Sequence, residues 1–439
     1  MLKGQVSKKI LAVMLLALVI RVIFSICYLP GHSIELYEYD DIAKNLVGGQ
    51  GFRMQHLSAT YFACTPPLYP FLCALFYKIL GINPVMIVCM QIAISIFACF
   101  AIYLVGRSVA GEAVGLISAL LYAVHPGFIL YTTTKLHSLV LDSLLFTLTL
   151  LMFMRLRSSG TVKQSVLTGV TAGMAALTRS TIISFLPFSF LWLMLCFRKN
   201  IKRFFVLACF IVIGFAVVVS PWVARNYLVM KDIVFITSAD AEVFWRGNNA
   251  NATGSSYTSS GEVVLMLDKD LYKKVNTLTE NEQRRLFRDE AMDFIKKDPK
   301  GFAMLFAKKL YYFWWFSPSA GILYPSFYAK IYKYVYGVVL ALASLGVFAG
   351  LRKKVRVDGA SLNVLIIFLV SISIFQSLFY VEGRHRWGIE PVLLSLRLWG
   401  WSGYTDICAF GKIRYEPGAS FGIMGESAGK RGSLFPEGR

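Results

Sequence analysis

Residues 10–29 read Ile10-LAVMLLALVIRVIFSICY-Leu29, an apolar run interrupted by the single charge of Arg21. Lys3, Lys8 and Lys9 precede this run, and no small-residue cleavage site follows it. A helix of about 20 apolar residues is long enough to cross the hydrocarbon core of a bilayer. The run therefore predicts a signal anchor that is retained, rather than a signal peptide that is removed.

The composition of the whole chain is that of a membrane protein. Of its 439 residues, 56% are hydrophobic and 16% are charged, whereas soluble domains carry roughly 25% charged residues. So few charges cannot solvate several soluble domains. Lys and Arg exceed Asp and Glu by 20, but in a membrane protein the positions of the charges matter more than their sum. We expect an all-α polytopic membrane protein that binds membrane lipids and no nucleic acid.

Hydropathy predicts about nine transmembrane helices. Besides 10–29, the apolar runs are 84–106, 113–131, 139–154, 166–177, 182–197, 204–223, 331–351 and 362–380. A last run, 389–398, is too short to span alone. The predicted organisation is a cytoplasmic N-terminus (1–9), the first span (10–29), a first outer segment (30–83), further spans (84–224), an outer cap (225–330), two spans with a partial last one (331–398) and an irregular tail (399–439).

Clusters of Lys and Arg fix the predicted orientation, because such clusters stay on the cytoplasmic side of a membrane. They fall at alternate ends of the spans, at 3–9, 107, 155–163, 198–203 and 352–356. This pattern places the N-terminus in the cytoplasm. Residues 30–83 and 225–330 then lie outside the plasma membrane, so we expect an extracytoplasmic active site.

Four acidic residues stand within seven positions after the first span: Glu35, Glu38, Asp40 and Asp41. Ordinary helix solvation and a favourable N-terminal dipole would explain one or two of them. Four acids at the membrane mouth of an acid-poor chain indicate a functional site. The apolar residues 65–81 that follow are too few to span, so they predict an interfacial helix.

Charged residues are also predicted near the outer ends of the spans. Asp142 lies close to Lys135 and His137 in the sequence, and a carboxylate at this depth must be paired or wet. It either faces a cavity or forms a structural pair with Lys135. Arg384 and Arg386 follow the run 362–380. Several outer cations opposite a carboxylate cluster suggest a site for a phosphate-linked lipid.

The outer cap contains two predicted amphipathic helices. Thr279 and Glu282 have the spacing of a capping box at the start of the first helix. That helix is expected to end before Asp298-Pro299, where a second helix begins. We therefore expect a small cap that lies along the membrane surface.

Six motifs occur in order along the chain. They are Glu35-LYEYDDIAKNLVGGQGF, Thr65-PPLYP, Ala176-LTR, Pro221-WVARN, Gly247-NNANATG and Glu382-GRHRWGIEP. Over about residues 8–395 this combination resembles bacterial GT-C glycosyltransferases of the family-39 kind, relatives of protein O-mannosyltransferases and of the lipid A aminoarabinose transferase. The resemblance implies a GT-C-like helix bundle with interfacial helices in its outer segments.

The resemblance also implies the reaction. Such an enzyme takes a sugar, a hexose or a pentose, from a polyprenyl-phosphate donor and gives it to a glycan, lipid or protein acceptor outside the cytoplasm. In the family, the catalytic or metal-binding carboxylate stands four residues before the tyrosine of the first outer helix. Counting back from Tyr39 gives Glu35, with Glu38 and Asp40 as alternatives. Glu35 and Glu38 are also the candidate ligands of a divalent cation, Mg²⁺ or Mn²⁺.

The donor phosphate needs positive charge around it. The aminoarabinose transferase has a lysine before its loop proline, where this chain has Thr65. Phosphate binding is therefore assigned to Arg384, Arg386 or a metal. Asp41, Lys135, His137 and Asp142 complete the predicted substrate-binding set.

The chemistry requires these residue types independently of the resemblance. A hydroxyl that attacks an anomeric carbon must lose its proton, and a carboxylate can accept it. A carboxylate also stabilises the oxocarbenium-like transition state. Cations offset the charge that develops on the departing phosphate. These requirements describe an inverting transfer at the membrane surface.

A transporter or lipid flippase is the alternative function, and it would show ionisable residues at mid-span and two related halves. Arg21 is the main mid-span charge. The final 45 residues, 395–439, hold 9 of the 34 glycines and have no helical period. We expect this tail to be disordered and to arise from a truncated or shifted reading frame.

Overall fold

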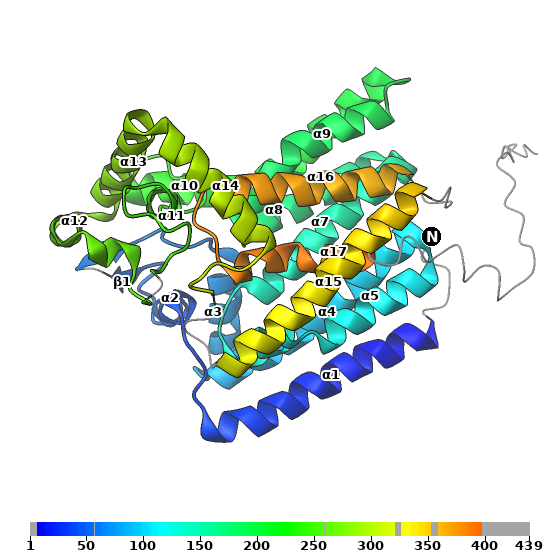
Figure 1. Cartoon of the computed structure of the whole chain (residues 1–439), viewed down its shortest axis with the longest axis horizontal. Coiled ribbons are helices and arrows are strands. Elements are labelled where there is room, and N and C mark those ends of the chain that lie inside the picture. The colour runs from blue at the N-terminus through cyan, green and yellow to red at the C-terminus, as the bar shows by residue number, and fades with distance from the viewer. Residues whose placement is uncertain (1–6, 57, 259, 321–325, 353–358, 397–439) are drawn as a thin grey trace, which may run out of the picture. The chain divides into compact units, whose positions relative to one another are not determined.

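The structure, a computed structural model, describes the chain except residues 1–6, 57, 259, 321–325, 353–358 and 397–439. The predicted tail 399–439 lies outside the described residues. Everything described belongs to one compact unit within residues 1–403. This unit is almost entirely helical, as the sequence predicts (Figure 1).

The long helices form a bundle (Figure 1). The α-helices are α1 (Lys8–Tyr28), α2 (Glu38–Val47), α3 (Leu68–Leu80), α4 (Pro84–Ala110), α5 (Glu112–Val124), α6 (Pro126–Thr134), α7 (Leu139–Ser159), α8 (Val162–Ala176), α9 (Phe185–Cys196), α10 (Ile201–Met230), α11 (Asp240–Gly247), α12 (Lys269–Val275), α13 (Glu280–Lys297), α14 (Pro299–Trp314), α15 (Ser326–Arg352), α16 (Gly359–Gln376) and α17 (Glu390–Leu396). Four 3₁₀-helices are η1 (Leu29–Gly31), η2 (Ser180–Ser184), η3 (Val264–Leu267) and η4 (Gly383–Gly388). Strands β1 (Met54–His56) and β2 (Ala59–Tyr61) pair antiparallel. Helices α2, α3, α11, α12 and α13 gather at one end of the bundle (Figure 1).

Five helical segments in the described part of the chain are long and apolar enough to cross a membrane, so the protein is a multi-pass membrane protein. They are Lys8–Gly31, Pro84–Ala110, Leu139–Ser159, Ile201–Met230 and Gly359–Gln376. The pair α5 and α6 makes a sixth span, bent by 51°. The predicted number of nine spans is not confirmed. Two of the predicted runs became α8 and α9, which at 15 and 12 residues are too short to cross alone.

The bend between α5 and α6 explains the position of Arg21 within the apolar part of α1. Pro126 starts α6 without a backbone N–H, and the α5 carbonyl groups next to the break accept hydrogen bonds from Arg21 instead. The Arg21 guanidinium is fully buried and donates to Ala123 O at 3.0 Å and to Tyr122 O at 3.5 Å. Arg21 therefore fastens α1 to the broken span, since a buried charge must find polar partners.

Small residues allow the closest helix packing, between α8 and α10. A Cβ atom added at Gly169 would lie 2.0 Å from Ile211 O, and one added at Gly214 would lie 2.5 Å from Val166 O. The two backbones touch at these glycines, as is common between membrane helices.

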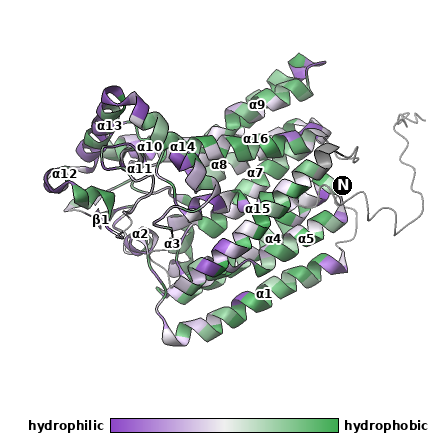
Figure 2. Ribbon diagram, viewed as in Figure 1, coloured by the Kyte–Doolittle hydropathy of each residue, from purple (hydrophilic) through white to green (hydrophobic). Residues whose placement is uncertain are grey.

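The two segments that the sequence predicts to lie outside the membrane form one cap beside the bundle. The predicted capping box of Thr279 and Glu282 is confirmed at the start of α13, and α14 begins at Pro299 as expected. The Glu280 carboxylate is buried and accepts hydrogen bonds from the backbone N–H groups of Phe62 and Ala63 at 2.6 and 3.0 Å. This joins the second outer segment to the first. Figure 2 shows α13 as largely hydrophilic, in contrast to the apolar helices α1, α4 and α5.

Candidate active site

Glu35 is held against the end of α6 by its own backbone. Its N–H donates to Thr134 O at 2.9 Å, and its carbonyl accepts from Leu136 N at 3.0 Å, in a parallel bridge beside Lys135. Its carboxylate atom Oε2 forms an ion pair with Lys135 Nζ and accepts a hydrogen bond from the Tyr37 hydroxyl at 3.0 Å. The side chain is 54% exposed. Glu35 is thus a fixed carboxylate that remains accessible.

Lys135 is the buried partner of this pair. Its side chain is only 4% exposed, and its Nζ atom lies 5.2 Å from the centre of the Tyr131 ring. Burial lowers the pKa of Lys135, the Glu35 carboxylate opposes that shift, and the nearby Arg384 adds to it. An ammonium group in this setting is stabilised by any further negative charge that enters the site.

Glu38, the first residue of α2, lies half-buried near two basic side chains. Burial raises the pKa of its carboxyl above the usual 4.5, while Arg384 and His56 act in the opposite direction. A raised pKa brings a carboxylate closer to the range in which it accepts a proton efficiently. Glu38 therefore remains a candidate base.

Asp40 and Asp41 are placed differently from the two glutamates. Asp40 is 2% exposed, accepts a hydrogen bond from the Tyr77 hydroxyl and pairs with Lys44 Nζ at 2.6 Å. One oxygen fastens α2 to α3 through Tyr77, and the other pairs with Lys44 within α2. Asp41 is exposed on α2. The acidic cluster therefore divides into two glutamates near Arg384, one aspartate with structural contacts and one exposed aspartate.

A cavity of about 1420 Å³ lies next to Glu35. One wall is apolar and comes from α1 and α6, with Ile20, Ile23, Phe24, Cys27, Ile129 and Leu130. The polar lining contains Glu35, Tyr37, Lys135, Lys330, Lys333, Glu382 and Arg384. The cavity therefore combines a hydrophobic wall with a polar lining in which four cationic side chains outnumber two carboxylates.

The two arginines of the 383–388 segment have separate roles. Arg384 lines the cavity, is 25% exposed and pairs with Glu382 at 3.1 Å. Arg386 is fully buried, donates to Trp315 O at 2.7 Å, pairs with Glu390 at 3.5 Å and lies 4.0 Å from the centre of the Tyr336 ring. Because structural partners surround Arg386, its predicted contact with a donor phosphate is not supported, and Arg384 is the better placed of the two.

Asp142 is paired, but not with Lys135. The Asp142 carboxylate is fully buried and lies 3.5 Å from Arg179 NH1, while Lys135 pairs with Glu35. The predicted structural pair of Asp142 with Lys135 is therefore wrong, and the partner of Asp142 is Arg179. The backbone explains the exchange, because the bridge at Glu35 sets Lys135 beside the first outer segment.

His137 lies behind the Glu35–Lys135 pair. Its ring contacts those of Tyr37, Tyr39 and Tyr131 at centroid distances of 5.2, 5.4 and 5.9 Å. Burial and the neighbouring cations lower the pKa of His137 well below its usual 6.5. His137 is therefore neutral, and it packs beneath the site.

Two residues that the sequence interpretation did not select also line the cavity. Lys330 and Lys333 lie near the start of α15, and both are exposed. Lys333 Nζ lies 5.7 Å from the centre of the Trp315 ring. A signal was present, since cations at the outer end of a predicted span oppose the usual charge bias. That same signal selected Arg384.

The described residues offer no group of three or more His, Cys, Asp or Glu side chains that could hold a metal ion. Glu35 already pairs with a lysine. The predicted Mg²⁺ or Mn²⁺ site at Glu35 and Glu38 therefore stays a prediction, with two carboxylates as its candidate ligands.

Comparison with known proteins shows which folds and families this chain resembles. Residues 64–224, from just before α3 into α10, match the family model of the dolichyl-phosphate-mannose-protein mannosyltransferases. An oligosaccharyltransferase of Archaeoglobus fulgidus tethered to an acceptor peptide matches with a TM-score of 0.55 at 14% identity, over 91% of this chain and 50% of that one. The chain has a GT-C fold. The resemblance predicted from the ordered motifs is thereby confirmed.

Two further solved structures are similar to this chain. The archaeal oligosaccharyltransferase AglB of A. fulgidus, in complex with an inhibitory peptide and a dolichol-phosphate, matches with a TM-score of 0.52 at 14% identity, over 92% of this chain and 52% of that one. ArnT of Cupriavidus metallidurans bound to undecaprenyl phosphate has a TM-score of 0.43 at 15% identity, over 91% and 78%. The chain thus spans about half the length of the oligosaccharyltransferases. No curated protein matches it.

Proposed function

We propose that this GT-C protein is a membrane glycosyltransferase that moves a sugar from a polyprenyl-phosphate carrier to an acceptor outside the cytoplasm. The single observation that carries the proposal is the cavity of about 1420 Å³, in which an apolar wall and basic side chains meet the accessible carboxylate of Glu35. A lipid-linked sugar has the same three parts: a hydrocarbon chain, a phosphate and a reacting sugar.

The carrier lipid fits the wall formed by α1 and α6. Ile23 on this wall is 55% exposed, and an apolar side chain gains free energy when a hydrocarbon chain covers it. α1 is a candidate membrane span, so this wall is built from a membrane helix. AglB was solved with a dolichol-phosphate, which supports a polyprenyl carrier for a protein of the same fold.

The donor phosphate fits among the basic residues of the cavity. Lys135 and Arg384 lie near the acidic residues, and Lys330 and Lys333 come from α15. Each can donate a charge-assisted hydrogen bond to a phosphate oxygen. These cations can neutralise the phosphate charge, as a metal ion does in other phosphate sites.

We assign the acceptor proton to Glu35. Lys135 and Tyr37 both contact Oε2, so Oε1 is the oxygen that receives the proton of the attacking hydroxyl. The acceptor oxygen bonds to the anomeric carbon as the bond from that carbon to the phosphate oxygen breaks. Polyprenyl phosphate leaves with the electron pair, and a single displacement inverts the anomeric centre. Glu38 is the alternative base, because burial raises its pKa.

The transferred sugar is a hexose or a pentose, and the acceptor is a glycan, a lipid or a protein. The basic clusters favour a plasma-membrane protein with a cytoplasmic N-terminus and an outer active site. The transporter alternative is weakened because Arg21, the charge that favoured it, is bound to backbone carbonyl groups of α5.

The proposal is tested by mass spectrometry of envelope glycans and lipids from cells that lack the protein. Expression of the wild-type chain should add one sugar to a defined envelope component. Expression of the double variant Glu35→Gln/Glu38→Gln should not. A glycan profile that is the same with and without the wild-type chain refutes a transferase function.

A further inference from the structure

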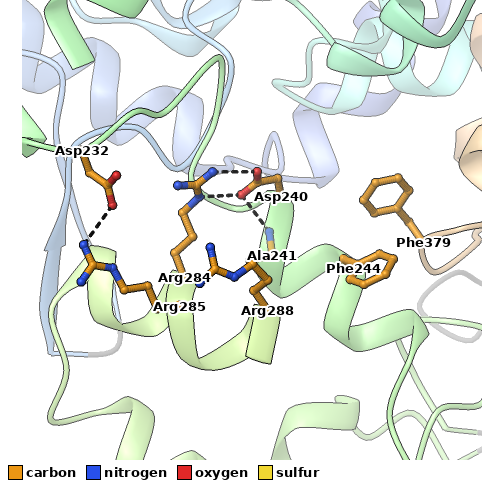
Figure 3. A pocket seen from close by; sticks show the side chains of 8 residues that line it. All are labelled: Asp232, Asp240, Ala241, Phe244, Arg284, Arg285, Arg288 and Phe379. Carbon is orange, nitrogen blue, oxygen red and sulfur yellow. Dashed lines mark hydrogen bonds and ion pairs between the residues drawn. The ribbon is translucent and has the colours of Figure 1, made fainter. Parts of the chain in front are cut away.

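A second pocket, of about 320 Å³, lies on the cap between α11 and α13. Figure 3 shows guanidinium groups of α13 on one side of it and the rings of Phe244 and Phe379 on the other. None of the residues that line this pocket lines the large cavity. Its volume suits a ligand the size of one small molecule or ring.

Arg284 forms the fixed part of the pocket. It makes two parallel hydrogen bonds with Asp240, at 3.0 and 3.2 Å, and donates to Ile233 O at 3.3 Å. The paired geometry fixes both side chains. The Asp240 carboxylate is nevertheless 48% exposed, so it can also accept hydrogen bonds from a ligand.

Arg285 and Arg288 are the more accessible cations of the pocket. Arg285 is 63% exposed and lies 3.4 Å from Asp232, and Arg288 is 60% exposed and lies 3.3 Å from the adjacent Asp289. Exposed pairs of this kind are weak. A ligand carrying a carboxylate or phosphate therefore competes for both guanidinium groups at little cost.

The opposite wall is aromatic. The rings of Phe244 and Phe379 meet edge to face, with centroids 5.8 Å apart, and both border the pocket. An aromatic wall beside carboxylates and guanidinium groups suits a molecule with a ring, several hydroxyl groups and an acidic group. A simple anion or a phosphopeptide uses the arginines alone.

The pocket is connected to the large cavity by one short segment. Phe379 borders the pocket, and Glu382, three residues later, lines the cavity. Three residues of extended chain span at most about 10 Å. An acceptor chain held at the pocket can therefore present a neighbouring unit to the cavity.

We propose that this pocket, named the acceptor pocket, binds an anionic saccharide, with Arg285 and Arg288 pairing with its acidic group and Phe244 and Phe379 packing against its ring. The inference rests on the proposed function, since it makes this saccharide the acceptor or a part of it. The acidic group is a carboxylate or a phosphate, which share the same pairing chemistry.

Binding to the full chain in nanodiscs of neutral lipid tests the proposal without any donor present. The probes are tetragalacturonate, maltotetraose phosphate and neutral maltotetraose, and thermophoresis measures their affinity. We expect at least one anionic probe to saturate the wild type and to bind more tightly than the neutral one. Arg285→Gln/Arg288→Gln should weaken that binding by about tenfold or more.

The matched control is Lys296→Gln/Lys297→Gln, which removes two exposed charges from the same helix, away from the pocket. It should bind as the wild type does, and Phe244→Leu should bind less tightly. The proposal is overturned if neither anionic probe saturates the wild type, if the double arginine variant binds equally well, or if a phosphopeptide binds more tightly than both saccharides.

The same assay separates this proposal from the proposed transfer. Glu35→Gln should retain wild-type affinity for the anionic probe, because Glu35 lies in the other cavity. Arginine-dependent binding in a protein that transfers no sugar would contradict the proposed function alone. Transfer without arginine-dependent binding would contradict the acceptor pocket alone.

Discussion

Lys135 and Glu35 stand side by side in a parallel bridge, and their side chains form an ion pair at the edge of the large cavity. Residues 100 positions apart thus place a carboxylate and a buried ammonium group in one site. In the proposed reaction this pair would hold the carboxylate in position for the acceptor and present positive charge to the donor phosphate.

Replacement of Lys135 by Gln should lower sugar transfer by about a hundredfold, because a fixed charge near the departing phosphate is lost. Tyr37→Phe removes only one hydrogen bond to Glu35 and should lower transfer by less than about tenfold. The release of polyprenyl phosphate measures both effects. Lys163→Gln, at an exposed position at the start of α8, is the control. Equal rates for Lys135→Gln and this control would contradict the role of Lys135.

Asp40→Asn should affect stability rather than chemistry. The change weakens the buried contacts to Tyr77 and Lys44, and loss of such a partner costs about 1–3 kcal/mol. We expect a lower Tm in detergent but normal transfer per folded molecule, whereas Glu35→Gln should lose transfer at an unchanged Tm. The assignment fails if Asp40→Asn keeps its Tm and loses transfer.

Substitutions at Arg384 and Arg386 should also have different effects, one on lipid binding and the other on stability. Arg386→Gln removes one basic partner of the buried Glu390 and leaves it with His125, 3.4 Å away, and breaking a buried pair costs about 3–5 kcal/mol. Arg384→Gln should keep the fold and weaken binding of polyprenyl phosphate, measured by displacement of a fluorescent analogue. Unchanged lipid affinity in Arg384→Gln would remove this residue from the phosphate site.

The stability of the wild type should depend on pH differently from that of the Glu38→Gln variant. Its pKa is raised above 4.5 in the folded protein by burial, so between 4.5 and the raised value the folded state holds more protons than the unfolded state. The wild type therefore loses stability, relative to Glu38→Gln, as the pH rises through this window. Tm measured for both proteins at several pH values checks the sign. A difference that is constant with pH would show that the pKa is not raised.

The membrane class could be predicted from the sequence, because it depends on local pattern; the assignment of the site to residues 35–41 stays a prediction. The long apolar runs became α1, α4, α7, α10 and α16, whereas of the acidic cluster only Glu35 and Glu38 lie near Arg384. The predicted number of nine spans stays unconfirmed, because α8 and α9 are shorter in the structure than a helix that crosses the membrane alone.

The distribution of roles within the site could not be predicted from local pattern. Arg384 and Arg386 have the same chemistry in the sequence, yet one lines the cavity and the other is enclosed by aromatic rings. Asp40 and Glu38 are also neighbours, but the α2–α3 contact fully buries only Asp40. These differences arise from contacts between distant segments.

The most direct measurement is the release of free polyprenyl phosphate by the purified chain in nanodiscs, supplied with a polyprenyl-phosphate sugar and an envelope extract as acceptor. The wild type should release polyprenyl phosphate in step with sugar transfer. The Glu35→Gln variant should release it at least about a hundredfold more slowly. Wild-type release by both Glu35→Gln and Glu38→Gln would contradict carboxylate-assisted transfer in this cavity.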